Sequence, residues 1–107
     1  MTKRPWGTFE VLSTNPTVKR ITVLPNQRLS LQYHGLRDEF WYFIEGEGGI
    51  ILKDKDIHVK PKANFYIPRG TTHRIYNDGD TNLVLIEIST GIFKEEDITR
   101  IQDDYIR

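Results

Sequence analysis

The sequence predicts an all-β chain built from short antiparallel strands. Turn-forming residues recur at short intervals, and the segments between them are rich in β-branched and aromatic residues, which favour strands. Regular short strands separated by turns are typical of an antiparallel sandwich or barrel. Helical character is confined to residues 94–101, where three successive acidic residues favour a helix N-terminus.

The turns divide the chain into a series of expected strands. Gly91 is expected to end the last barrel strand and to begin a short C-terminal tail or helix. The 107 residues fit one compact domain, so we expect a single domain over residues 1–107. The expected strands cover residues 8–13, 18–24, 29–34, 39–45, 48–53, 56–60, 64–67, 73–77 and 82–89.

Composition excludes several classes of function. The 15 Lys and Arg residues balance 15 Asp and Glu residues, and no basic stripe stands out, so nucleic acid is not expected as a partner. There is no cysteine, so a metal site would use imidazole, carboxylate or amide ligands. The N-terminus lacks the apolar core of a signal peptide, and no apolar run reaches membrane-spanning length. We therefore expect a cytoplasmic protein with no membrane partner.

One segment brings three ligand-type side chains together. Residues two apart in a strand point to the same face, so Gln32 and His34 can converge on one inward-facing point. The loop 35–38 then turns the chain, and Glu39 opens the next strand, from which its carboxylate can approach the same point.

A second segment offers a further ligand. His73 begins a strand after a Pro-Gly turn, and a late strand can lie beside an early one in a barrel. His58 stands in a polar hairpin without such partners and is expected at the surface. A strand histidine is more often a surface or hydrogen-bonded residue than a ligand, so the hypothesis depends on the combined spacing of Gln32, His34, Glu39 and His73.

The four side chains form a coherent ligand set. Two imidazoles, one carboxylate and one amide oxygen suit zinc, iron, manganese, cobalt or nickel, and are too rich in nitrogen for calcium.

Both segments match in spacing the two motifs of the cupin superfamily, G-x5-H-x-H-x3,4-E-x6-G and G-x5-P-x-G-x2-H-x3-N. The corresponding residues here are Asn26, Gln32, His34, Glu39 and Gly46, and then Lys62, Pro68, Gly70, His73 and Asn77. The glutamine in place of the first histidine resembles the phosphomannose isomerases, which use a Gln-x-His pair, a Glu and a distant His around zinc. Segments 4–7, 18–23, 27–32, 66–68, 72–74 and 96–105 are also similar to the cupin domain of type II phosphomannose isomerases.

The resemblance implies a cupin barrel, that is, a double-stranded β-helix or jelly roll. It implies a metal-dependent aldose–ketose isomerase that converts mannose 6-phosphate to fructose 6-phosphate. The cofactor would be one divalent ion, zinc in the first place, with manganese, cobalt, nickel or iron as alternatives. In the family this domain is commonly fused behind a mannose-1-phosphate guanylyltransferase domain, whose chemistry is not expected from these residues.

Two other functions stay open. Gly35, Leu36 and Phe40 stand where the family usually has further histidines, which favours a non-catalytic module that binds a metal or a sugar phosphate. A metal-dependent dioxygenase is a third candidate, but iron oxygenases more often keep the full histidine pair, so Gln32 counts against it.

Catalysis would require a phosphate anchor and a general base. Arg28, Arg74 and Arg100 are candidates for the phosphate, because guanidinium forks match its oxygens; Arg28 shares strand parity with Gln32 and would face inward. The base must carry a proton between C1 and C2 of the sugar. Glu45, which has the parity of Glu39, and Lys19 are the candidates.

The remaining expectations concern packing and assembly. Trp6, Trp41, Phe43 and Phe65 are expected in the core, with Trp41 and Phe43 beneath the metal because they share the parity of Glu39. Sheet edges need to be covered, and the strand-like segment 8–12 could pair with the sheet of a partner. We therefore expect a homodimer that binds a small sugar phosphate.

Overall fold

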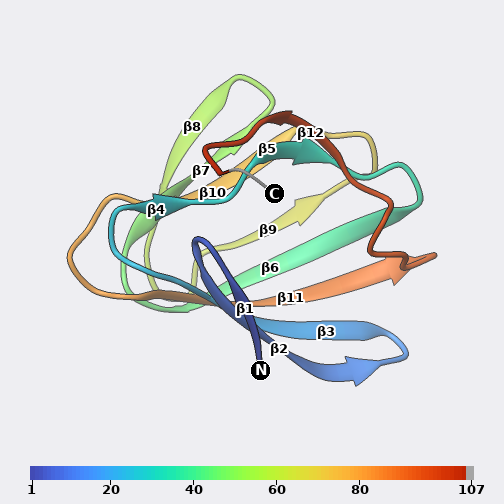
Figure 1. Cartoon of the computed structure of the whole chain (residues 1–107), viewed down its shortest axis with the longest axis horizontal. Coiled ribbons are helices and arrows are strands. Elements are labelled where there is room, and N and C mark those ends of the chain that lie inside the picture. Colours follow the sequence, from blue (N-terminus) through green and yellow to red (C-terminus); the bar gives the residue numbers. More distant parts are fainter. Residues whose placement is uncertain (106–107) are drawn as a thin grey trace.

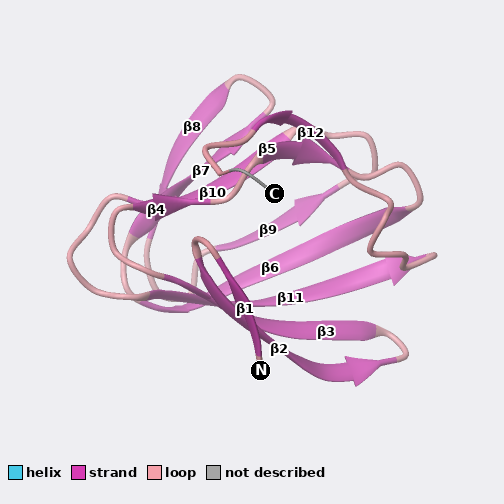
Figure 2. Ribbon diagram, in the orientation of Figure 1, coloured by secondary structure: helices cyan, strands magenta, loops and turns pink. Residues whose placement is uncertain are grey.

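The computed structural model describes residues 1–105 and contains two antiparallel sheets that pack face to face (Figures 1 and 2). The first sheet has the order β1 (Thr2–Arg4), β2 (Gly7–Thr14), β3 (Thr17–Val23), β11 (Leu83–Gly91), β6 (Arg37–Glu45) and β9 (Asn64–Ile67). The second has the order β12 (Thr99–Gln102), β5 (Leu31–Tyr33), β10 (His73–Asn77), β7 (Gly48–Leu52) and β8 (Lys55–Val59), with β4 (Gln27–Arg28) beside β10. The predicted all-β architecture is confirmed.

The C-terminal segment was expected to form a tail or a helix, and the helical alternative was wrong. Residues 1–105 contain no helix, and therefore none that could cross a membrane. Thr99–Gln102 instead forms β12, which pairs with β5 at the edge of the second sheet. Pairing with an open sheet edge satisfies the backbone of this segment, and this outweighs the local preference of its acidic residues. In Figure 1 the C-terminal segment, in red, crosses from the end of β11 in one sheet to β5 in the other.

One expected strand is interrupted. Residues 29–34 do not form a continuous strand, because the chain leaves the ladder between β4 and β5. Both short strands pair with β10, but through separate sets of partners. Strand parity is therefore not carried from Arg28 to Gln32.

The inward-facing side chains change from polar to apolar along the central strands of the first sheet. Lys19 on β3, Glu87 on β11 and Trp41 on β6 lie side by side in the ladder. One pleat further along lie Ile21, Leu85 and Phe43. The barrel interior therefore has a polar end and an apolar end. The two ends adjoin because inward-facing residues follow each other at every second position along a strand.

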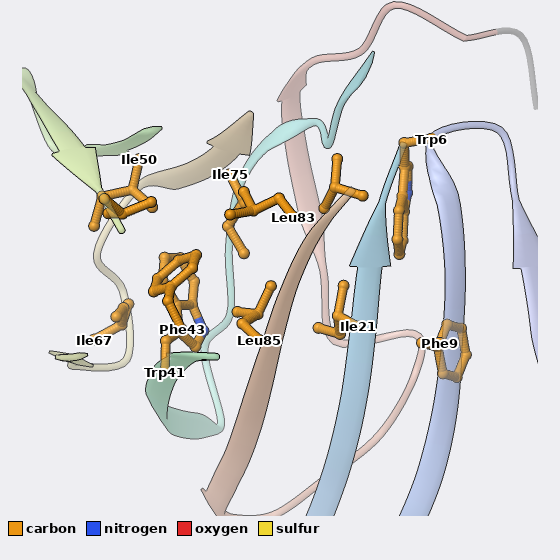
Figure 3. Close-up of a cluster of buried hydrophobic side chains, with 12 residues drawn as sticks. Trp6, Phe9, Ile21, Trp41, Phe43, Ile50, Ile67, Ile75, Leu83 and Leu85 are labelled. Atoms are coloured by element: carbon orange, nitrogen blue, oxygen red, sulfur yellow. The ribbon is translucent and has the colours of Figure 1, made fainter. Parts of the chain in front are cut away.

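The apolar end forms the core that holds the two sheets together (Figure 3). Phe43 and Leu85 from the first sheet face Ile50 and Ile75 from the second, and all four are at most 2% exposed. Each such side chain stabilises the fold by about 1.5–3 kcal/mol on burial. The expected core positions are confirmed: Trp6, Trp41 and Phe43 are buried, and Phe65 packs against them.

Candidate metal centre and active site

The polar end of the barrel brings the histidines and Glu39 together. His34 follows β5, Glu39 lies on β6, and His73 is the first residue of β10. The turn before β10 is tied to the first ligand segment, because the Gly70 amide donates a hydrogen bond to the His34 carbonyl at 2.7 Å. Gly70 adopts a φ of 80°, a conformation that glycine accommodates without strain.

Three potential ligand atoms converge. One atom each from His34, Glu39 and His73 lies within 4.8 Å of the other two. His34 Nε2 is 3.3 Å from Glu39 Oε2, and His73 Nε2 is 3.8 Å from Glu39 Oε1. All three side chains are at most 5% exposed.

Backbone carbonyls determine which imidazole nitrogens carry the protons. His34 Nδ1 lies 2.7 Å from the Asp97 carbonyl oxygen, and His73 Nδ1 lies 2.9 Å from that of Thr71. A carbonyl only accepts hydrogen bonds, so each Nδ1 carries a proton, and in the neutral form of the ring each Nε2 keeps a lone pair. Two lone pairs and a carboxylate therefore point toward one another, an arrangement that a cation stabilises and that is common around protein-bound metals.

Charge keeps Glu39 ionised. Burial by itself would raise the pKa of Glu39, but the charges that His73 and His34 carry when protonated, together with the guanidinium of Arg37, outweigh burial and lower it. Trp41 Nε1 donates to Oε1 at 3.1 Å, and Arg37 Nε donates to Oε2 at 3.0 Å. Burial is also the largest cause that lowers the pKa of His73, which favours its neutral, metal-binding form.

Gln32 lies beside this cluster. It is the cross-strand partner of His73, it is buried, and it lines the same cavity. Its amide nitrogen donates to Ser30 Oγ at 3.0 Å, so the amide oxygen is the ligand atom it can offer. The donor set fits a divalent transition metal.

A cavity of about 110 Å³ opens onto the cluster. The acidic and basic side chains that line it, besides Glu39 and the two histidines, are Arg4, Lys19, Arg37, Glu87, Glu95 and Arg100. Cations and carboxylates beside a candidate metal centre suit an anionic, polyhydroxylated ligand.

Glu87 is a buried carboxylate that sequence reasoning missed. Burial, with the charge of Glu39 as the next cause, raises its pKa to about 8. Its Cα partner across the ladder is Lys19, whose ammonium donates to Glu95 Oε1 at 3.0 Å. A signal was present in the sequence, because Glu87 interrupts the apolar run 83–88 with the parity of a core residue.

The C-terminal segment completes the cavity. Arg100 on β12 is the cross-strand partner of Gln32, and it therefore lines the cavity as expected. The Asp97 carboxylate accepts the Gly35 and Leu36 amides, each at 2.9 Å, while the Asp97 carbonyl holds His34. The tail thus lies over the first ligand segment.

Four other predicted or considered positions lie outside the cavity. Arg28 is 43% exposed and pairs with Asp104 on the outer face, because the break before β5 reverses the expected parity. Arg74 is buried, but its guanidinium donates to the Leu29 carbonyl and to Gln102. Glu45 is exposed at the end of β6, where the pairing with β11 shifts register. His58 is at the surface, beside Glu47, as expected.

The barrel has the cupin fold. A Cupin 2 conserved barrel domain protein from Salinispora arenicola superposes with a TM-score of 0.69 at 16% identity, over 76% of this chain and 72% of that one. The capsular polysaccharide assembling protein CapF from Staphylococcus aureus superposes with a TM-score of 0.83 at 23% identity, over 95% of this chain and 32% of that one. At these identities the likeness establishes the fold.

The sequence places the chain more narrowly. It belongs to the family of mannose-6-phosphate isomerase C-terminal domains, whose model matches residues 1–103. The xanthan biosynthesis protein XanB of Xanthomonas campestris is 39% identical over 107 residues, which is 97% of this chain and 23% of XanB. The chain therefore spans about a quarter of the length of this relative.

Proposed function

We propose that the chain is a metal-dependent aldose–ketose isomerase acting on a hexose 6-phosphate, with mannose 6-phosphate and fructose 6-phosphate as the pair interconverted. Family membership supports this substrate class. The observation that carries the proposal is the convergence of two imidazole lone pairs and an ionised carboxylate at a cavity that also contains Glu87 and Lys19.

The metal would be held by His34, Glu39 and His73, with Gln32 as a fourth ligand. Zinc is the first candidate, and manganese, cobalt, nickel or iron also suit the ligand set. When bound, such an ion supplies Lewis-acid stabilisation of the negative charge that develops on the sugar oxygens.

Isomerisation moves one proton from C2 to C1 of the sugar and a second proton from the C2 hydroxyl to the C1 oxygen. Glu87 is the carboxylate we assign to this transfer, because it lines the cavity on β11, next to the strand that carries Glu39. Lys19 lies opposite Glu87 in the ladder and lines the same cavity, and in this proposal it would donate to a sugar oxygen. Arg100 at the edge of the cavity would hold the phosphate.

A non-catalytic binding module is the alternative, suggested by the missing histidines at positions 35, 36 and 40. Gly35, Leu36 and Phe40 are exposed, and none of them lines the cavity. Histidines at these positions would lie outside the polar end of the barrel, so their replacement leaves the candidate site unchanged. This observation supports the isomerase over the binding module.

The test is a coupled assay of fructose 6-phosphate formed from mannose 6-phosphate by the purified chain. We expect turnover that a chelator removes and that zinc, manganese or cobalt restores. Glu87→Gln should lower kcat by about 10²–10⁴-fold, whereas the matched variant Glu45→Gln, on an exposed carboxylate, should retain activity. A folded, metal-loaded sample that binds the sugar phosphate but forms no ketose would establish the binding module instead.

A further inference from the structure

Arg37 is a buried cation that contacts the metal ligands directly. Its Nε donates to Glu39 Oε2 at 3.0 Å, and one terminal nitrogen, Nη2, lies 3.3 Å from His34 Nε2. The other terminal nitrogen, Nη1, donates to the Lys94 carbonyl at 3.1 Å, and the guanidinium lies 4.4 Å from the centre of the Phe93 ring. The Arg37 side chain is therefore fixed by the two candidate ligands, by the Lys94 carbonyl and by the Phe93 ring.

The contact with His34 uses the atom that a metal requires. Arg37 can only donate, so its contact with His34 makes Nε2 the acceptor through that atom's single lone pair, while Nδ1 carries the proton that bonds the Asp97 carbonyl. One imidazole lone pair cannot accept a hydrogen bond and bind a metal at the same time. Glu39 differs in this respect, because its two oxygens offer several acceptor positions.

We propose that Arg37 competes with the metal for His34 Nε2 and thereby sets the metal affinity of the centre. This inference rests on the metal ligands of the proposed function. Binding a metal requires only the Nη2 end of the fork to leave, since the bonds to Glu39 and to the Lys94 carbonyl can persist. The guanidinium also repels a divalent cation, because an arginine stays charged at all relevant pH values.

The opposite expectation follows for an ordinary supporting residue. A side chain that merely orients a ligand strengthens metal binding, and its loss weakens affinity by about 10–100-fold. A side chain that competes with the metal weakens metal binding, and its loss increases the affinity. The sign of the change in affinity therefore distinguishes the two roles.

The test compares zinc affinity of the full chain and its variants at pH 7.5 by competition with a chromophoric chelator. Arg37→Met removes the charge and the donors but keeps an unbranched side chain of similar length over Phe93, and it should bind zinc about tenfold more tightly. Arg100→Met is the matched control, because it removes a charge from the same cavity without a bond to His34. This control should change the affinity by less than about twofold.

The outcomes are separable. Unchanged or weaker zinc binding by folded Arg37→Met overturns the inference, and so does an equal gain in both variants, which would reflect cavity charge alone. If the wild-type chain binds no zinc, cobalt or manganese, the metal centre of the proposed function fails with it.

A measurement on the wild-type chain remains decisive if Arg37→Met does not fold. In the presence of a chelator, ¹⁵N spectra of the histidines should show both rings as Nδ1–H tautomers. The Nε2 resonance of His34 should lie upfield of that of His73, because only the former accepts a hydrogen bond from an arginine. Identical Nε2 shifts would refute the competition.

Discussion

Replacing Glu87 by glutamine should stabilise the protein, and more so as the pH rises. The folded-state pKa of Glu87 is about 8, compared with an ordinary value of 4.5, because the carboxylate is buried and faces Glu39. Between these two values the folded chain binds a proton that the unfolded chain has lost. The wild-type chain therefore loses stability as the pH rises from 4.5 to about 8, whereas the glutamine variant does not.

The magnitude follows from the size of the shift. A difference of about 3.5 pH units at about 1.4 kcal/mol per unit corresponds to about 5 kcal/mol above pH 8, and to about 3 kcal/mol at pH 7. For a domain of this size, 3 kcal/mol corresponds to a rise in Tm of more than about 10 °C.

The assay is urea unfolding of both chains from pH 5 to pH 9 with a chelator present, so that bound metal does not alter the charge near Glu87. The stability difference should be small at pH 5 and should grow with pH up to about pH 8. Glu45→Gln is the control, because this carboxylate is exposed on the same sheet, and the variant should remain within about 0.5 kcal/mol of the wild-type stability. A Glu87→Gln difference that is constant across the pH range would refute the reasoning.

The remaining predictions concern metal, substrate and assembly. His34→Ala and His73→Ala should remove most bound metal as measured by elemental analysis, while His58→Ala should retain it; equal metal in all three would contradict the ligand assignment. Arg100→Ala should raise the KM for mannose 6-phosphate by about 10–100-fold through loss of a charge-assisted hydrogen bond. Arg28→Ala should leave KM within about twofold. A larger effect of Arg28→Ala than of Arg100→Ala would be incompatible with the cavity described above. We retain the prediction of a homodimer, which light scattering at micromolar concentration checks and a monomeric mass would disprove.

The structure narrows the part of segment 8–12 that could pair with a partner sheet in the expected homodimer. The segment 8–12 lies in β2, where Thr8 and Phe9 already pair with β1 on one side and with β3 on the other. Within this segment, residues 10–12 have no strand beside them on the β1 side among residues 1–105, and Val11 and Leu12 are about half exposed. A partner sheet would therefore be added at the distal half of β2.

Local sequence was sufficient for most of the strands, because turn chemistry and side-chain alternation act over a few residues. It was also sufficient to bring the candidate metal ligands together: Gln32 and His34 are two residues apart, and the short loop before Glu39 leaves little freedom in where that carboxylate goes. The parity that placed Trp41 and Phe43 beneath Glu39 held because β6 is one uninterrupted strand.

Strand parity gave the wrong side-chain direction where the expected strand was not continuous. Arg28 was expected to face inward with Gln32, but the break between β4 and β5 sends it to Asp104 on the outer face. Arg74 was a candidate for the phosphate, but it holds Gln102 of the C-terminal strand. Whether a cation binds a ligand or the chain itself depends on which distant segment lies next to it.

The sequence by itself determined the all-β architecture, the position of the core and the convergence of the candidate metal ligands, because these depend on residue periodicity and spacing within short segments. Only the tertiary structure decided how the polar end of the barrel is completed. The pairing of β11 with β3 brings Glu87 opposite Lys19, and the pairing of β12 with β5 brings Arg100 beside Gln32. Each of these contacts joins segments more than 60 residues apart, and no local pattern specifies which sheet edge a distant segment will find.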